Sequence, residues 1–241
     1  MVTTIDSQIN RRTVLAGVGA GAVASLAGCA TDGVVDITIQ PGGLHEECQE
    51  INELPVDRFI EFTANEEVSA GGVSRTFNFN SYLATYVNDW TTMAVATFPR
   101  YVVGGVDLLP FNQIDPEDEE LLQELLDLEN IENVELVAEQ EIENENEHLG
   151  ETTAYEYEVT FESGDVVNVI LSEFIVEEGG EDGVRVLVFG VYSNAVGGNV
   201  PQTILNMTEA VEYPSEQLRN KEAEQQDLFD HIDEDDIEFE E

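Results

Sequence analysis

The alternation of apolar and polar residues is most regular in the second half of the chain. Over residues 152–162, apolar residues, mostly tyrosine and valine, alternate with glutamate and threonine, which is the period of a strand with one buried face. Apolar runs follow at residues 166–176 and 184–192, and glycine-containing turns at 163–164 and 179–183 separate the three segments. This pattern predicts a three-stranded antiparallel meander.

Weaker patterns predict further elements on both sides of the meander. Residues 80–87 carry apolar residues at helical spacing behind Asn80, which is a helix-capping residue type. Asp115 and Pro116 are typical of the start of a second helix, and a stripe of leucines follows them to residue 128. Residues 201–213 predict a closing helix. Runs of β-branched and aromatic residues predict strands at residues 34–39, 58–63, 73–79, 91–98 and 101–106.

The order of these elements indicates a fold class. The last two strands of the meander are apolar on both faces, so we expect helices on both sides of the sheet. A strand pair, an acid-capped helix, a meander and a closing helix, at residues 91–112, 116–128, 152–192 and 201–213, resemble the PsbP-like fold. The resemblance implies an α+β fold in which an antiparallel sheet is sandwiched between helices. PsbP-like domains act chiefly as accessory or assembly factors, so it also implies a non-enzymatic role.

The first residues have the layout of an export signal. Arg11 and Arg12 precede an uncharged run, residues 13–31, built largely of Gly, Ala and Val, as in a twin-arginine signal peptide. Leu26-Ala27-Gly28-Cys29 resembles a lipobox, after which a lipoprotein is cut before its cysteine and lipidated on the thiol. The alternative is an uncleaved anchor, since the run is close to the ~20 residues that span a bilayer, although its glycines disfavour a helix.

Acidic residues dominate the charge. The chain has 52 Asp and Glu against 8 Lys and Arg, a formal net charge of −44. In molar salt the Debye length falls to ~3 Å, so repulsion is screened while the carboxylates keep the surface hydrated. The acids are spread through every segment, which favours salt adaptation over a nucleic-acid mimic or a calcium buffer. Binding to nucleic acid is disfavoured because phosphate contacts need Lys and Arg.

Leader and charge together resemble those of haloarchaeal secreted lipoproteins. Phe98-Pro99, Gly105 and Pro110-Phe111-Asn112 are similar to uncharacterised families of the same group. The resemblance implies an extracellular domain held by a lipid on the outer face of the membrane. We therefore expect a signal peptide at residues 1–28, a tether at 29–55, an α+β domain at 56–214 and a disordered acidic tail at 215–241.

Familiar catalytic and cofactor motifs are absent from the sequence. It contains no Gly-x-Ser-x-Gly, P-loop, Gly-x-Gly-x-x-Gly or His-Glu-x-x-His. His45-Glu46-Glu47-Cys48 holds metal-capable residue types, but no second cluster supports it, so we interpret it as a chance surface run. We expect no metal, no cofactor and no identifiable catalytic residue. If Cys29 carries a lipid, Cys48 is a lone thiol.

Two residues are candidates for contact or modification. Trp90 could stack a sugar or a peptide, although a lone tryptophan at the end of an element is more often part of the core. Asn206 begins the glycosylation sequon Asn206-Met207-Thr208, which falls in the predicted closing helix.

Three functions are compatible with these observations. The favoured one is a membrane-tethered accessory or binding protein that holds a cell-surface protein or a small ligand. An extracellular hydrolase would require two converging acids, one with a pKa raised by burial. A structural component of the envelope would require self-association through a flat apolar patch.

Overall fold

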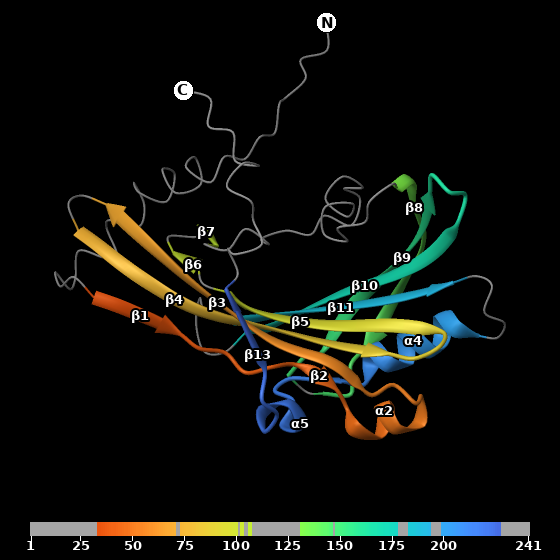
Figure 1. The fold of residues 1–241 in the computed structure, drawn as a ribbon, viewed down its shortest axis with the longest axis horizontal. Helices are drawn as coiled ribbons and strands as arrows, with labels where there is room; N and C mark the ends of the chain where they lie inside the picture. The colour runs from red at the N-terminus through yellow and green to blue at the C-terminus, as the bar shows by residue number, and fades with distance from the viewer. Residues whose placement is uncertain are drawn as a thin grey trace, which may run out of the picture.

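A large mixed sheet dominates the fold. The computed structural model describes residues 33–70, 73–100, 102–103, 106–107, 131–146, 148–177, 183–193 and 199–227, and shows the sheet with short helices against it (Figure 1). The strands are β1 (Gly33–Ile37), β2 (Gly43–Leu44), β3 (Val56–Ala70), β4 (Val73–Val87), β5 (Thr91–Arg100), β6 (Val102–Val103), β7 (Val106–Asp107), β8 (Ile131–Glu143), β9 (Glu151–Phe161), β10 (Val166–Glu177), β11 (Gly183–Ser193), β12 (Val211–Glu212) and β13 (Glu224–Asp227). The helices are α2 (Glu46–Ile51), α4 (Val200–Glu209) and α5 (Glu216–Arg219).

The strand order of the sheet is β13-β3-β4-β5-β11-β10-β9-β8. β1 pairs with residues 75–79 of β4 and β5 pairs with residues 82–87, so these two strands share one edge of β4. Antiparallel pairing was expected throughout and is confirmed for the central strands. β1 and β13 instead run parallel to β4 and β3, which makes the sheet mixed.

The predicted meander is confirmed as β9, β10 and β11. In its register Val169 of β10 lies opposite Tyr157 of β9 and Val191 of β11. The alternation expected for β9 is also found, since Tyr157 and Val159 are almost fully buried in one cluster. A period of two was therefore sufficient to predict both the strand and its buried face.

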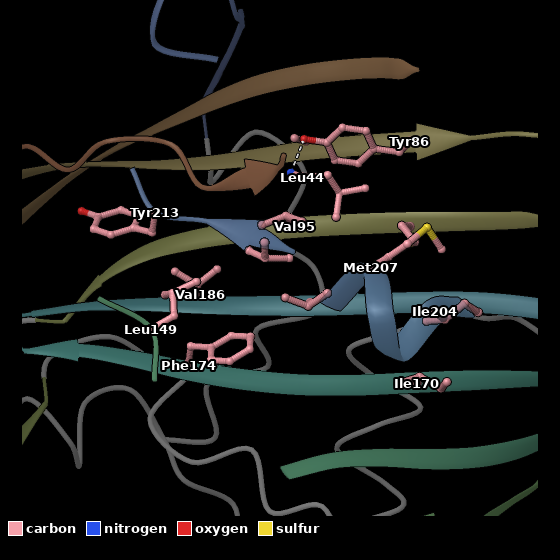
Figure 2. Packing of buried hydrophobic residues seen from close by; sticks show 14 of the residues in the cluster. Leu44, Tyr86, Val95, Leu149, Ile170, Phe174, Val186, Ile204, Met207 and Tyr213 are labelled. Atoms are coloured by element: carbon pink, nitrogen blue, oxygen red, sulfur yellow. Dashed lines mark hydrogen bonds between the residues drawn. The ribbon is translucent and has the colours of Figure 1, made fainter. Parts of the chain in front are cut away.

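All three described helices lie on the same face of the sheet (Figure 1). Together with the short β2–β12 ribbon they bury the main apolar cluster, which joins sheet residues such as Phe174 to Met207 of α4 and Leu44 of β2 (Figure 2). The predicted closing helix is confirmed as α4. It ends at Glu209, because the next residues pair with β2 as β12.

The close approach of α4 depends on one glycine. Gly190 of β11 lies directly under the side chain of Ile204, and a Cβ atom at this position would collide with the Ile204 methyl group. Ile204 is fully buried there. A glycine in the middle of a strand often marks such a close approach to a neighbouring element.

A second apolar cluster lies on the opposite face of the meander. Val169 and Leu171 belong to it, whereas Ile170 between them belongs to the main cluster. Successive side chains of a strand point to opposite faces, so both faces of β10 are apolar, as predicted. The helix expected at residues 115–128 lies outside the described residues.

The helix predicted at residues 80–87 is wrong, because these residues form the second half of β4. Asn80, Ala84 and Tyr86 are buried on the helix-covered face, and Tyr82 lies partly buried among them. These buried residues alternate with a period of two, as in a strand, and β3 and β5 pair with this part of β4 on either side. Pairing in the sheet overrides the local helical spacing.

The expected tether and tail also need correction within the described residues. Residues 33–55 form β1, β2 and α2, and Leu44 and Leu54 are fully buried. After Pro214, α5 buries Leu218 and β13 joins the edge of the sheet beside β3. The polar composition of both segments concealed a few apolar residues that dock on the main cluster.

Candidate functional site: the α2 corner

The residues of the predicted export signal, Arg11, Arg12 and Cys29, lie outside the described residues. Within the described part of the chain, no helix is long and apolar enough to cross a membrane. The described surface is that of the sheet and its covering elements.

The sequon residue Asn206 lies on the exposed side of α4. Its Oδ1 atom accepts a hydrogen bond from Nε2 of Gln202 at 2.9 Å. Thr208, the third residue of the sequon, is buried, and its hydroxyl donates to the carbonyl of Ile204 at 3.0 Å. The side chain of Asn206 is thus exposed, whereas the hydroxyl of Thr208 is buried. Glycosylation of Asn206 stays a prediction.

The short helix α2 begins at a histidine cap. Nδ1 of His45 accepts the backbone N–H of Glu47 at 3.2 Å, which satisfies one of the free donors of the first turn. Glu46 and Glu47 add negative charge at the positive end of the helix dipole. His45 of the predicted surface run is therefore a capping residue in this fold.

The same helix ends in a Schellman turn. The N–H of Leu54 donates to the carbonyl of Gln49 at 2.9 Å, and that of Glu53 donates to the carbonyl of Glu50 at 3.3 Å. Glu53 has a φ of 51°, a left-handed conformation that glycine usually occupies at this position. The turn directs Leu54 into the main cluster and leaves Ile51 outside it.

Buried polar contacts hold α2 against the sheet. Nε2 of Gln49 donates to the carbonyl of Leu44 and to Oε1 of Gln217, both at 2.7 Å. The N–H of Leu44 in turn donates to the hydroxyl of Tyr86 in β4 at 3.0 Å (Figure 2). Burial raises the pKa of this tyrosine, so its hydroxyl stays protonated. α2 is thus a fixed part of the surface.

The C-terminal end of α2 meets the turn between β4 and β5. Nδ2 of Asn88 donates to the carbonyl of Asn52 at 3.0 Å and joins the two segments. Ile51, which precedes Asn52, is 73% exposed. Val87, which precedes Asn88, is 39% exposed and points to the face of the sheet opposite to Tyr86. Trp90 lies two residues beyond Asn88 and is partly buried. We call Ile51 and Trp90, with the Asn52–Asn88 hydrogen bond that joins their segments, the α2 corner.

Trp90 contributes to the corner and to the core. Its backbone N–H donates to Oδ1 of Asn88 at 3.0 Å, and so does that of Thr91, which holds the turn in one conformation. The indole packs against the main cluster. The sequence interpretation of a core residue is confirmed, and contact with a ligand through the remaining exposed surface stays a prediction.

Cys48 lies on α2 behind the corner. It is partly buried, and Nδ2 of Asn52 donates to its Sγ atom at 3.5 Å. Burial is the main reason that the pKa of the thiol is raised, so the thiol is protonated at neutral pH. Among the residues described, no group of three or more His, Cys, Asp or Glu side chains could hold a metal ion.

Glu212 lies at the other end of α2. Its Oε1 atom is 3.4 Å from Nε2 of His45, and its side chain is 28% exposed. Burial is the main cause that raises the pKa of Glu212, and the negative charges of Glu216 and Glu46 raise it further, whereas His45 lowers it. A half-buried acid with a raised pKa, beside an imidazole and two other acids, is a candidate group for proton transfer.

Sequence comparison identifies the family. Residues 57–233 match the family described as domain of unknown function DUF6517, which is more than half of the chain. The chain belongs to the DUF6517 family. A search of curated proteins finds no match. The DUF6517 match begins within β3 and ends beyond β13, past the predicted domain end at residue 214.

The limits of the DUF6517 match set the α2 corner apart. α2 precedes residue 57, while Trp90 lies inside the match. The corner therefore combines a helix outside the DUF6517 region with a turn inside it. Sequence reasoning missed Ile51 because it assigned α2 to a tether, and it missed Glu212 because it placed this residue in the predicted closing helix, whereas Glu212 lies in β12. The capping residues around Glu46–Ile51 were the signal that could have found the helix.

Replacing Glu212 with glutamine is expected to raise the urea midpoint of unfolding at neutral pH. The folded-state pKa lies above the ordinary value of 4.5, so the ionised carboxylate destabilises the fold. The gain should be complete above the folded-state pKa and should disappear as the pH falls below 4.5. Urea titrations at several pH values, with the exposed Glu222→Gln as control, would measure it. A gain that is the same at every pH contradicts this account.

Proposed function

We propose that this chain is a lipoprotein of a halophilic archaeon, exported by the twin-arginine route and anchored by a lipid on Cys29 to the outer face of the membrane. Its role is non-enzymatic, as an accessory or binding protein. The leader with Arg11, Arg12 and the Leu-Ala-Gly-Cys run supports the anchor. The net charge of −44 supports an environment of high salt.

The exposure of Ile51 is the observation that carries the binding role. A large aliphatic side chain that is 73% exposed, on a helix joined by a hydrogen bond to the turn that carries an aromatic ring, is what a contact surface offers to a partner. The corner is rigid, because the Asn52–Asn88 hydrogen bond and the Schellman turn hold it. Little conformational entropy would be lost on binding.

We also propose the finer fold, an α/β/α sandwich of the PsbP type. The described helices cover one face of the sheet, and the apolar cluster around Tyr157 and Leu171 lies on the other. A sheet that is apolar on both faces needs a cover on both. The resemblance to PsbP-like domains agrees with an accessory role.

Site-specific crosslinking tests the binding role. A photoreactive amino acid at Ile51 should capture a cell-surface protein or ligand in intact cells, because the corner is the contact surface. The same group at Ile175, which is 44% exposed on β10, is the matched control. Equal capture from both positions, or none from Ile51, contradicts the proposed contact surface.

Membrane fractionation with mass spectrometry tests the anchor separately. A chain that begins at Cys29 and carries a lipid on this residue should be recovered in the membrane fraction, and Cys29→Ala should shift the protein to the soluble fraction. Arg11→Lys with Arg12→Lys should block export. An unmodified Cys29 in the membrane fraction would instead indicate the uncleaved anchor.

Glu212 favours a second candidate function, an extracellular hydrolase. Its raised pKa and the nearby acids Glu46 and Glu216 meet part of the requirement for a carboxylate pair. Hydrolysis of glycosidic or ester substrates that is lost in Glu212→Gln and kept in Glu209→Gln would establish this function. Activity retained in both variants would exclude Glu212 as the acid.

A further inference from the structure

A row of polar side chains crosses the four strands at the β8 end of the sheet. Glu135 of β8 lies opposite Glu158 of β9, Glu158 lies opposite Asn168 of β10, and Asn168 lies opposite Tyr192 of β11. Residues opposite each other in neighbouring strands share a face. Tyr192 belongs to the main cluster, so the row lies on the helix-covered face.

Asn168 is the buried member of this row. The residue is 5% exposed, and its Nδ2 atom donates to Oε1 of Glu156 at 3.3 Å. Rotating the amide by 180° would place its oxygen against the carboxylate, so the hydrogen bond fixes the orientation. In this orientation Oδ1 is buried and has no hydrogen-bond partner. A buried amide oxygen without a donor or cation costs free energy.

The neighbouring carboxylates cannot donate a hydrogen bond to Oδ1 of Asn168. Glu156 already accepts hydrogen bonds from Asn168 and from the hydroxyl of Tyr192 on the same oxygen atom. A carboxylate has no proton to donate to Oδ1. Glu158 and Glu135 are like charges placed directly opposite each other, which destabilises a strand pair. One positive charge between them would satisfy the amide oxygen and relieve this repulsion.

We propose that Asn168 and Glu158 bind a hard divalent cation, with Ca²⁺ as the preferred ion. Oδ1 of Asn168 and the carboxylate of Glu158 are the protein ligands, and Glu135 and Glu156 add negative charge around them. Carboxylate and amide oxygens together with water are the ligands that Ca²⁺ takes in flexible geometry. The site uses a single carboxylate as ligand, so it is compatible with the lack of any group of three acidic or metal-binding side chains among the described residues.

The cation can reach this position from solvent. Glu135 is exposed on β8, the last strand in the described order, and Glu158 is partly exposed. The glutamate side chain has several rotatable bonds and can move to admit an ion beside Asn168. With few protein ligands the affinity should be that of weak extracellular sites, about 10⁻⁴–10⁻³ M.

Calorimetric titration and thermal unfolding of the full chain with Ca²⁺ test the site. Ca²⁺ at ten times its Kd should raise the Tm by about 3–5 °C. NaCl of equal ionic strength should raise it less. In Glu158→Gln the Kd should rise at least about tenfold, because one charged ligand is lost. This glutamate is partly exposed, so the variant should fold.

A second glutamate pair provides the control. Glu143 and Glu151 also lie opposite each other on β8 and β9, and the buried amide next to them, that of Asn144, already has hydrogen-bond partners for its nitrogen and its oxygen. Glu151→Gln should leave the Kd for Ca²⁺ within about twofold. Equal effects of the two variants would show counterion condensation and overturn the site. A Ca²⁺ effect no larger than that of NaCl would also overturn it, and would assign the partner of Asn168 to a water molecule.

Discussion

Replacing Leu218 with alanine is expected to lower the free energy of unfolding by about 2–5 kcal/mol. Leu218 is 1% exposed and belongs to the main cluster, although it lies on the four-residue helix α5 after Pro214. Removing its isobutyl group leaves a cavity against Tyr86 and Gly43, which the fixed β2 strand cannot close. Urea unfolding followed by circular dichroism would measure the loss.

The exposed residue Glu222 supplies the control for this experiment. Glu222→Ala lies four residues further along the chain and should change the free energy of unfolding by less than about 0.5 kcal/mol. If Leu218→Ala were as mild as Glu222→Ala, the segment after Pro214 would make no stabilising contribution. The docking of α5 would then be incidental to the fold.

The second large effect is the dependence of stability on salt. The fold should be largely lost near 0.1 M NaCl and restored above about 1 M, because the Debye length falls from about 10 Å to 3 Å. Glu135 opposite Glu158 and Glu143 opposite Glu151 are particular repulsions that the salt would screen. Far-ultraviolet circular dichroism at increasing NaCl concentration would follow the transition.

Sucrose separates screening from a general stabilising effect. This osmolyte favours compact states by exclusion from the protein surface and carries no charge. If screening is the cause, sucrose should restore less structure at 0.1 M NaCl than molar salt does. A protein that is fully folded at low salt would contradict the interpretation of the charge as salt adaptation.

The meander and α4 could be predicted because their patterns are local. Tyr157 and Val159 alternate with glutamates, and Ile204, Met207 and Val211 repeat at helical spacing. Residues 80–87 fit both periods, and only pairing with β3 and β5 selects the strand. A single sequence does not reveal that pairing, so the helix predicted there was wrong.

The candidate site could not be predicted for a related reason. β2 has two residues and α2 has six, which is too short for a periodic pattern. They are held by distant partners, such as Tyr86 for Leu44 and Gln217 for Gln49. The exposure of Ile51 likewise follows from the contact between Asn52 and Asn88. Such contacts become visible only in the folded chain.

The start of β1 at Gly33 has a consequence for a chain anchored at Cys29. Gly33 is the fourth residue after Cys29, so even a fully extended connection reaches only about 14 Å. A lipid at Cys29 would hold the start of the first strand within about 14 Å of the membrane surface, so the sheet could not move far from it. The short connection would limit the binding partners of this protein to molecules that reach the same membrane surface.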